Sequence, residues 1–390
     1  MEKQNDSSTY RSGSLPKLRF PDFSDNWNTK KMGDIAKFSK GKGISKSEIS
    51  VDGTTQCIRY GELYTRYGEV INEVYSKTDV DLKNLVLSEA NDVIIPASGE
   101  TQIDIATASC VMKSGIALGG DLNIIKTENN GVFLSYYLNN RKKTEIANLA
   151  QGISVVHLYS SQLATLNLNL PTLLEQTRIA SFFSVVDQKL AQLKQKKSLL
   201  EQYKKGVMQK LFSQEMHFKD ENGKEFPKWE KKKLGEVLTI GSGRDYKHLG
   251  LGEIPVFGTG GYMTSVNDFL YDGETVCIGR KGTINSPMFY KGKIWTVDTL
   301  FYTHSFKNSI PKFVYYVFQT INWKEHNEAS GVPSLSKSTI EKILMPIPCL
   351  PEQTKIGNFL STLDEKIERT QNQIQQTEQY KKGLLQKMFC

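Results

Sequence analysis

Basic side chains beside glycines are the residues of this sequence whose types and spacing suggest a chemistry. They occur in the stretches GKGISKS (41–47), GSGRDYKH (241–248) and GRKG (279–282), and around a tyrosine-rich turn. Glycine lets a backbone approach a phosphate closely, and Arg or Lys can reach a phosphate or the edge of a guanine. We predict nucleic-acid contacts here, although each loop taken alone is equally compatible with a solvated turn. The candidate DNA-binding residues are Lys42, Lys46, Arg59, Arg66, Arg244, Lys247, Arg280 and Lys281.

No pattern in the sequence indicates catalysis. GKGISKS lacks the GxxxxGK[ST] spacing of a nucleotide-binding loop. The glycines of VFGTGGY (256–262) do not fit GxGxxG, and no NPPY-type tetrapeptide accompanies them, so we interpret this stretch as a β-turn. The histidines show no HxH or HExxH spacing and the cysteines no CxxC spacing. We therefore expect no catalytic residue, no metal site and no cofactor bound by this chain.

Composition places the chain among ordinary globular proteins. Its 390 residues suggest two or three domains, and 38% hydrophobic with 24% charged residues exclude a disordered chain. With 50 Lys and Arg against 42 Asp and Glu, the net charge of +8 mildly favours an anionic partner. No apolar run is long enough to span a bilayer, and the first residues, MEKQNDSSTYRSGS, lack the apolar core of a signal peptide. We expect a cytoplasmic protein without membrane contact.

An internal repeat organises the sequence. Residues 170–212 and 347–389 align without a gap at an offset of 177, with 19 identities in 43 positions. Weaker similarity links WNTKKMG, which begins at Trp27, to WEKKKLG, which begins at Trp229, and Asp121 to Asp298. The chain is therefore a tandem duplication, in which a variable segment is followed each time by a nearly identical one.

The repeated segments are predicted to be long helices. Apolar residues recur every seven positions with a second stripe four positions on, which is the coiled-coil pattern, and no proline interrupts either stretch. Thr172 with Glu175 suggests a capping box for the first helix, and Pro351 suits the first turn of the second. The predicted seam residues of the helix pair are Ile179, Phe183, Val186, Leu190, Leu193, Leu200, Val207, Leu211, Ile356, Leu360, Leu363, Ile367, Ile374, Leu384 and Met388.

Polar residues interrupt this seam in both copies. They are Lys204, Lys381, Thr370 and Thr377. They could set the register of the helix pair, or they could be imperfections on a partly solvated helix.

A helix of about 38 residues is roughly 57 Å long, so the second helix must lead the chain back. The simplest closed arrangement is two antiparallel helices with one variable segment at each end, related by a pseudo-twofold axis. Such a protein offers the same surface twice, so a partner that recognises it is expected to bind as a pair.

The variable segments read as mixed, strand-rich structure. VIIPASG (93–99) and TVCIG (275–279) are short β-branched runs that end in glycine. Each segment also ends with an aromatic helical stretch, FLSYYLNN (133–140) or FVYYVFQT (313–320). We interpret these aromatics as core residues rather than as a platform for stacked bases.

Taken together, these motifs resemble the specificity subunit of type I restriction-modification systems. The resemblance rests on the repeated EQT and EQTK starts at Glu175 and Glu352, the EQYKKG ends at Glu201 and Glu378, and the tryptophan openings. It covers nearly the whole chain and implies an α+β fold with two α/β target recognition domains separated by two long antiparallel coiled-coil helices. The predicted segments are a disordered N-terminal tail (1–14), recognition segment 1 (15–169), helical region 1 (170–215), recognition segment 2 (216–346) and helical region 2 (347–390).

The resemblance also implies a function and partners. Each recognition domain would read one half of a bipartite, asymmetric sequence of double-stranded DNA. Two methylation subunits would carry the S-adenosylmethionine chemistry, and two restriction subunits would supply the ATP-driven motor and nuclease, with ATP and Mg bound there. The chain itself would be a non-catalytic subunit.

Two other classes of function remain to be weighed. A methyltransferase or nuclease in its own right would need a cofactor or metal motif, which the sequence lacks. A coiled-coil adaptor without DNA would give no reason for two dissimilar segments that carry glycine and arginine. We favour a DNA-reading scaffold, whose binding should be sequence-specific and salt-dependent.

Overall fold

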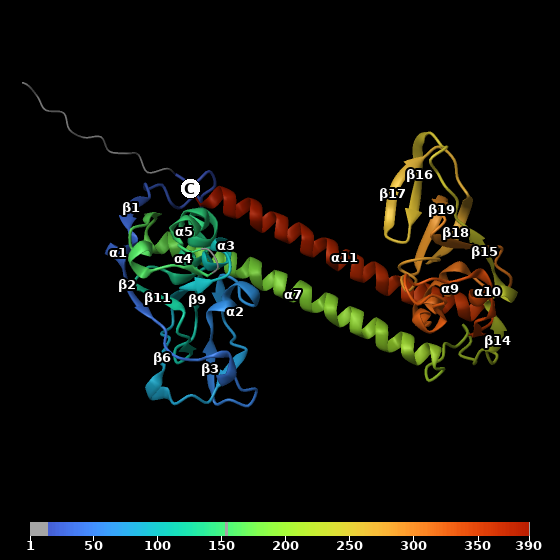
Figure 1. Cartoon of the computed structure of the whole chain (residues 1–390), viewed down its shortest axis with the longest axis horizontal. Helices are drawn as coiled ribbons and strands as arrows, with labels where there is room; N and C mark the ends of the chain where they lie inside the picture. The colour runs from blue at the N-terminus through green and yellow to red at the C-terminus, as the bar shows by residue number, and fades with distance from the viewer. Residues whose placement is uncertain (1–14, 153–154, 390) are drawn as a thin grey trace, which may run out of the picture. The chain divides into compact units, whose positions relative to one another are not determined.

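A computed structural model describes residues 15–152 and 155–389 (Figure 1). The tail predicted over residues 1–14 lies outside the described residues. The chain divides into two compact units. Unit 1 contains the described residues up to Leu193 together with those from Gln373 onward, and unit 2 contains Lys194–Asn372. Each unit therefore combines one variable segment with parts of both predicted helices.

Unit 1 is built on a five-stranded sheet of order β2-β11-β7-β9-β4, antiparallel except where β4 joins β9. A four-stranded sheet and two strand pairs accompany it. The strands are β1 (Asn28–Lys31), β2 (Ala36–Lys40), β3 (Thr55–Ile58), β4 (Val70–Ile71), β5 (Ser76–Thr78), β6 (Val86–Leu87), β7 (Asp92–Pro96), β8 (Ser98–Gly99), β9 (Ser109–Val111), β10 (Ala117–Leu118), β11 (Leu122–Thr127), β12 (Val156–His157) and β13 (Asn167–Leu170). The short helices are α1 (Met32–Ile35), η1 (Lys46–Glu48), α2 (Tyr60–Thr65), η2 (Leu82–Asn84), α3 (Gln102–Ile105), α4 (Gly131–Tyr137), η3 (Leu138–Lys142), α5 (Lys143–Leu149) and α6 (Ser160–Leu163).

Unit 2 is built on a six-stranded sheet of order β15-β20-β18-β19-β16-β17, antiparallel except between β16 and β19. A separate pair, β14 with β21, precedes the second long helix. The strands are β14 (Glu230–Lys233), β15 (Thr239–Ser242), β16 (Leu251–Gly258), β17 (Gly261–Val266), β18 (Tyr271–Gly279), β19 (Met288–Thr296), β20 (Leu300–His304) and β21 (Leu344–Ile347). The short helices are α8 (Leu234–Val237), α9 (Pro311–Thr320), η4 (Trp323–His326) and α10 (Lys337–Lys342).

The two units share a framework of strands. The antiparallel series β2-β11-β7 of unit 1 has the same order and directions as β15-β20-β18 of unit 2. The pair β1 with β13 likewise corresponds to β14 with β21, and each pair leads directly into a long helix. Beyond this framework the sheets differ. The predicted fold class, a duplicated α+β chain with mixed variable segments and two long helices, is confirmed.

The aromatic helical stretches fill the cores of their units, as the sequence predicted. In unit 1, Phe133 and Tyr137 on α4 are fully buried against the sheet and the ring of Phe389. In unit 2, Phe313 and Phe318 on α9 are equally buried. Burying rings of this size contributes about 1.5 to 3 kcal/mol each, so these helices hold the sheets in place and are unavailable to stack on bases.

The two long helices are α7 (Leu173–Phe212) and α11 (Leu350–Met388). Within unit 1, the first part of α7 packs antiparallel on the last part of α11, where Phe183 stacks on Phe389 and Leu193 joins Ile374 in one cluster. Within unit 2, Leu211 at the end of α7 and Ile356 near the start of α11 share one core. An antiparallel helix pair is thus present in each unit.

The starts of the long helices are fixed by the repeated Glu-Gln pair. Gln176 is buried, and its side chain accepts from the amide of Asn130 at 3.0 Å and donates to the carbonyl of Pro171 at 3.0 Å. Gln353 repeats this arrangement with the amide of Ile310 and the carbonyl of Pro348, at 3.0 and 2.8 Å. The repeated motif therefore joins each long helix to the recognition segment before it.

The predicted capping box is only half formed. Thr172 Oγ1 accepts from the amide of Glu175 at 3.4 Å, but the Glu175 carboxylate turns away to Arg19, with both contacts at 2.7 Å. A charge-assisted bidentate pair is stronger than a bond to one backbone amide, which explains the departure. Pro351 lies in the first turn of α11, as predicted.

Candidate nucleic-acid interface

Two basic loops predicted separately in recognition segment 2 meet at one end of the six-stranded sheet. The amide of Arg244 donates to Thr296 O, and the amide of Arg280 donates to Thr299 O, each at 2.8 Å. Thr296 is the last residue of β19, and Thr299 lies in the short connection from β19 to β20. Arg280 Nη1 also donates to Asp298 O at 3.3 Å. The two exposed arginines therefore flank a single short connection.

The turn of the β16–β17 hairpin joins this group of loops. VFGTGGY forms the hairpin turn, as predicted, with Gly258 paired to Gly261 and φ +107° at Gly261. A Cβ at Gly282, where φ is +91°, would lie 3.5 Å from Thr259 Oγ1. Tyr262, just past the turn, is 63% exposed. No pattern in the sequence singles out Tyr262, because only the hairpin fold brings it to the basic loops.

Recognition segment 1 brings Lys42 and Arg59 to one glycine pair. The amide of Lys42 donates to Leu118 O at 2.9 Å, and the amide of Gly120 donates to Gly43 O at 3.0 Å. The amide of Gly119 donates to Ile58 O, next to Arg59, at 2.9 Å. Two loops far apart in the sequence thus converge on Gly119 and Gly120.

Arg59 carries an unsatisfied donor at this point. Its Nε is buried and has no hydrogen-bond acceptor among the residues that the structure describes. An unpaired buried donor of a charged group costs about 1 to 3 kcal/mol or more. An oxygen supplied from outside the chain would remove that cost.

The other candidate residues lie farther out on the same loops. Arg66 is at the opposite end of α2 from Arg59, about 10 Å along the helix, and pairs loosely with Glu62 at 3.8 Å. Lys46 is exposed on η1, and Lys247 is exposed in the turn that follows Arg244. Lys281 is exposed beside Arg280 and pairs with Ser334 in an isolated bridge.

Lys42 and Arg244 occupy equivalent places in the two units. Each follows a glycine at the end of the first strand of the shared framework. A Cβ on Gly41 or Gly243 would lie 1.9 Å from a carbonyl oxygen, that of Gly119 or Val297. No side chain fits at such a distance, so glycine is required at both positions. The sequence signal, a glycine followed by a basic residue, was present in both loops, but their equivalence depends on the strand order.

Two buried cysteines, Cys57 and Cys277, are not activated as nucleophiles. Burial raises the pKa of the Cys277 thiol to about 12 and that of Cys57 to about 11, so both remain protonated near neutral pH. Within the described ranges, no group of three or more His, Cys, Asp or Glu side chains could hold a metal ion. No helix of the described residues is long and apolar enough to cross a membrane.

The predicted seam residues all belong to α7 and α11. Most are buried and the rest are half-buried. The buried ones are Ile179, Phe183, Leu190, Leu193, Val207, Leu211, Ile356, Leu360, Leu363, Ile374 and Met388. The half-buried ones are Val186, Leu200, Ile367 and Leu384.

Two similar strand frameworks, each with glycine-framed basic loops and each joined to a long helix, define a class of duplicated recognition protein. Comparison with known proteins identifies the family. The sequence model of the type I restriction modification DNA specificity domain matches residues 24–202 and 227–379, so this chain belongs to that family. It is a type I specificity subunit with two recognition domains, and specificity subunits are the non-catalytic members of these systems.

Individual relatives agree with this assignment. The chain is 23% identical to the type I restriction enzyme MjaVIII specificity subunit of Methanocaldococcus jannaschii, over 94% of this chain and 92% of that protein. A second protein of the same organism, the putative MjaX specificity subunit, is 25% identical over 68% of this chain and 70% of its own length. The crystal structure of the S subunit from M. genitalium matches with a TM-score of 0.71 at 19% identity, covering 97% of this chain and 99% of that one.

Proposed function

We propose that this subunit reads a bipartite, asymmetric sequence of double-stranded DNA, one half-site per recognition segment. The observation that carries the proposal is the equivalence of Lys42 and Arg244, because the same frame presents a basic side chain in each unit while the neighbouring loops differ. Different loops on one frame suit two different half-sites. The orphan Nε of Arg59 supports a contact with a phosphate or base oxygen.

Methylome sequencing tests this proposal. A host that carries this chain and its methylation subunit should show methylated adenines in one two-part motif with an unread gap. Arg59→Ala should weaken recognition of one half of the motif, and Arg244→Ala the other half. If both variants altered the same half, the assignment of one segment to each half-site would be wrong.

We further propose that two methylation subunits bind on a face that the repeat presents twice. Tyr203 and Tyr380 are 55% and 58% exposed at equivalent positions of the EQYKKG motif. Three residues on, one helical turn away, a Cβ on Gly206 or Gly383 would meet nothing within 4 Å. A helical glycine costs about 1 kcal/mol, and no contact of the described chain explains these two. Close approach of a partner's backbone would explain both.

Gly206→Leu and Gly383→Leu test this docking face. Each change fills open space and favours the helix, so the subunit should fold. Native mass spectrometry of the complex should then show one methylation subunit in place of two for either single variant. Gln375→Leu, at an exposed α11 position outside the repeated motif, is the matched control. Retention of both methylation subunits by both glycine variants would contradict the proposal.

The remaining chemistry is assigned to the partners. We propose that S-adenosylmethionine is bound by the methylation subunits, that ATP and Mg are bound by two restriction subunits, and that the complex works in the cytoplasm. The purified chain alone should then show no methylation, nuclease or ATPase activity. Turnover of S-adenosylmethionine by this chain without a partner would contradict the assignment.

A further inference from the structure

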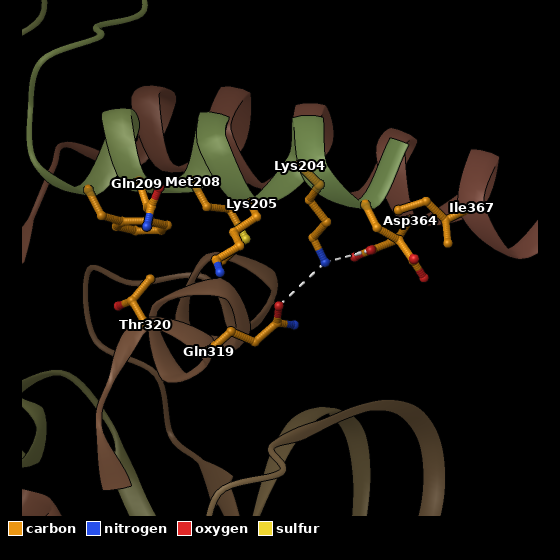
Figure 2. Close-up of a pocket in the computed structure, with 10 residues that line it drawn as sticks. Lys204, Lys205, Met208, Gln209, Gln319, Thr320, Asp364 and Ile367 are labelled. Atoms are coloured by element: carbon orange, nitrogen blue, oxygen red, sulfur yellow. Dashed lines mark hydrogen bonds and ion pairs between the residues drawn. The ribbon is translucent and has the colours of Figure 1, made fainter. Parts of the chain in front are cut away.

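Lys204, one of the polar residues that interrupt the seam, lies in an ordered group of side chains in unit 2. Its Nζ is 2.6 Å from Asp364 Oδ1 on α11 and 5.2 Å from the centre of the Tyr316 ring on α9. Tyr316 OH donates to the other Asp364 oxygen at 2.7 Å. Figure 2 shows Lys204 extending from α7 toward Asp364 and Gln319, beside a cavity of about 560 Å³. Three elements, α7, α11 and α9, therefore meet in one Lys–Asp–Tyr triad.

Unit 1 contains the same triad with the roles of the long helices exchanged. Lys381 on α11 lies 2.7 Å from Asp187 on α7 and 5.2 Å from the centre of the Tyr136 ring on α4. Tyr136 OH donates to Asp187. Both the lysines and the aspartates are separated by the repeat offset of 177 residues. The triad is thus part of the duplicated design. Unit 1 adds a contact of its own, because Lys381 Nζ also lies 3.2 Å from Glu69 in the loop before β4.

The triads stand where the apolar stripes would otherwise continue. The lysine side chains are only 14% and 15% exposed, so each charge depends on its aspartate and tyrosine for stabilisation. Apolar side chains in place of a whole Lys–Asp pair would give equal or greater stability, because a partly buried ion pair repays its desolvation only in part. Apolar packing, however, tolerates small slides and rotations. A hydrogen-bonded charge with two fixed partners is satisfied in one arrangement only.

The tyrosine of each triad belongs to the recognition segment, so the triad joins that segment to both long helices. α9 and α4 are the aromatic helices that pack against the sheets of their units. Tyr316 on α9 and Tyr136 on α4 are almost fully buried. A shift of either helix along the long helices would separate the buried hydroxyl from its aspartate and leave that hydroxyl without its acceptor.

We propose that the two Lys–Asp–Tyr triads are positioning residues that fix the orientation of each recognition segment on its long helices. This inference rests on the proposed bipartite reading. The consequence concerns the gap between the half-sites. A firmly oriented recognition segment accepts its half-site at one gap length only. A loosened segment also accepts gaps of neighbouring length.

The test uses the subunit assembled with its methylation subunits. DNA substrates would carry the two half-sites found for the parent protein, with gaps one base pair shorter, equal or one base pair longer. For Lys204→Met, methylation at altered gaps relative to the parent gap should rise by about tenfold or more, because hydrogen bonds to charged groups contribute about that factor. The half-site sequences should stay unchanged.

Lys196→Met is the matched control, because it removes the same charge from an exposed position of α7 outside the EQYKKG motif. It should keep the parent's gap profile. Loss of stability alone would lower methylation at all gaps in proportion, so the ratio between gaps separates positioning from folding. If Lys204→Met does not assemble, Tyr316→Phe carries the test, because it keeps the ring and removes only the donor to Asp364.

An assembled Lys204→Met complex whose gap profile equals that of the Lys196→Met control would overturn the inference, and so would an unchanged profile for Tyr316→Phe. The proposed function fails separately, if the parent complex itself methylates no two-part site.

Discussion

In unit 1 the residues after β7 are Ala97 and Ser98, the latter beginning β8, whereas in unit 2 the residues after β18 are Arg280 and Lys281. The backbone at these places is the same. Ala97 donates to Asp121 O and accepts from the amide of Leu158, and Arg280 donates to Thr299 O and accepts from the amide of Leu335. A fixed pattern of main-chain bonds thus carries different side chains, which indicates that the backbone frame does not depend on the side chains at these positions.

The largest effect is expected from exchanging a whole recognition segment. Replacing residues 216–346 with the matching segment of a related subunit should change one half-site completely and leave the other intact, because the shared framework and the Gln353 contacts would be kept. Methylome sequencing of the chimaera measures both halves at once. If both half-sites changed, the segments would not be independent readers.

A second comparison concerns the glutamates at the helix starts. Glu175 is fully buried and forms a bidentate pair with Arg19, which is itself mostly buried. Glu352 is 2% exposed and accepts from Trp229 Nε1 at 2.9 Å. Glu175→Gln should lower the free energy of unfolding by about 3 kcal/mol, since it leaves a guanidinium poorly paired. Glu352→Gln keeps an acceptor for the indole and should cost little at pH 7.

Urea unfolding of the two glutamine variants measures this difference. Because the change is isosteric in both, each serves as the control for the other. An equal loss of unfolding free energy in the two variants would show that the ion pair with Arg19 does not make the start of α7 differ from the start of α11.

Smaller effects are expected from single basic residues. Arg280→Ala makes the unit 2 loop resemble Ala97 of unit 1, and it should weaken binding of one half-site by about 1 to 3 kcal/mol. A base contact would relax specificity at one position, whereas a phosphate contact would weaken all sequences and flatten the salt dependence by about one unit. DNA binding at several salt concentrations separates the two. Lys224→Ala, in the exposed turn before β14, removes the same charge and should have no such effect.

The smallest effect concerns pH. Burial raises the pKa of Glu352 above its ordinary value of 4.5, although the bond from Trp229 opposes the shift. The folded chain then holds this proton more tightly than the unfolded chain does. The stabilisation is present below pH 4.5 and is lost as the pH rises through the folded pKa. The unfolding free energy of the parent, relative to Glu352→Gln, should therefore fall as the pH rises above 4.5. If the unfolding free energy of the parent relative to Glu352→Gln rose with pH instead, the folded structure would favour the ionised carboxylate of Glu352.

Much of the framework could be predicted from the sequence because its signals are local. The seven-residue stripes predicted both long helices, and β-branched runs ending in glycine predicted β7 and β18. The aromatic stretches were placed in the core correctly because their spacing is helical. The capping box was half wrong, since Arg19 lies 156 residues from Glu175 and no local pattern indicates that it competes for the carboxylate.

The candidate interface was less accessible to sequence reasoning. The basic residues could be selected by type, but the convergence of Arg244 with Arg280 depends on the order of strands in the sheet. Arg59 and Arg66 are close in sequence, yet α2 separates them. The role of Lys204 could not be decided either, because Asp364 and Tyr316 reach it from distant parts of the chain.

The glycines that precede Lys42 and Arg244 have a consequence for how such a protein can change over generations. Mutation of Gly41 or Gly243 meets a carbonyl oxygen at 1.9 Å, whereas the next residue is exposed in both units. A position that requires glycine is thus followed directly by an exposed position that tolerates other side chains. Under the proposed function, single-codon changes at the exposed position would alter base preference without disturbing the fold, so variation would be directed to the place where it changes the sequence that is read.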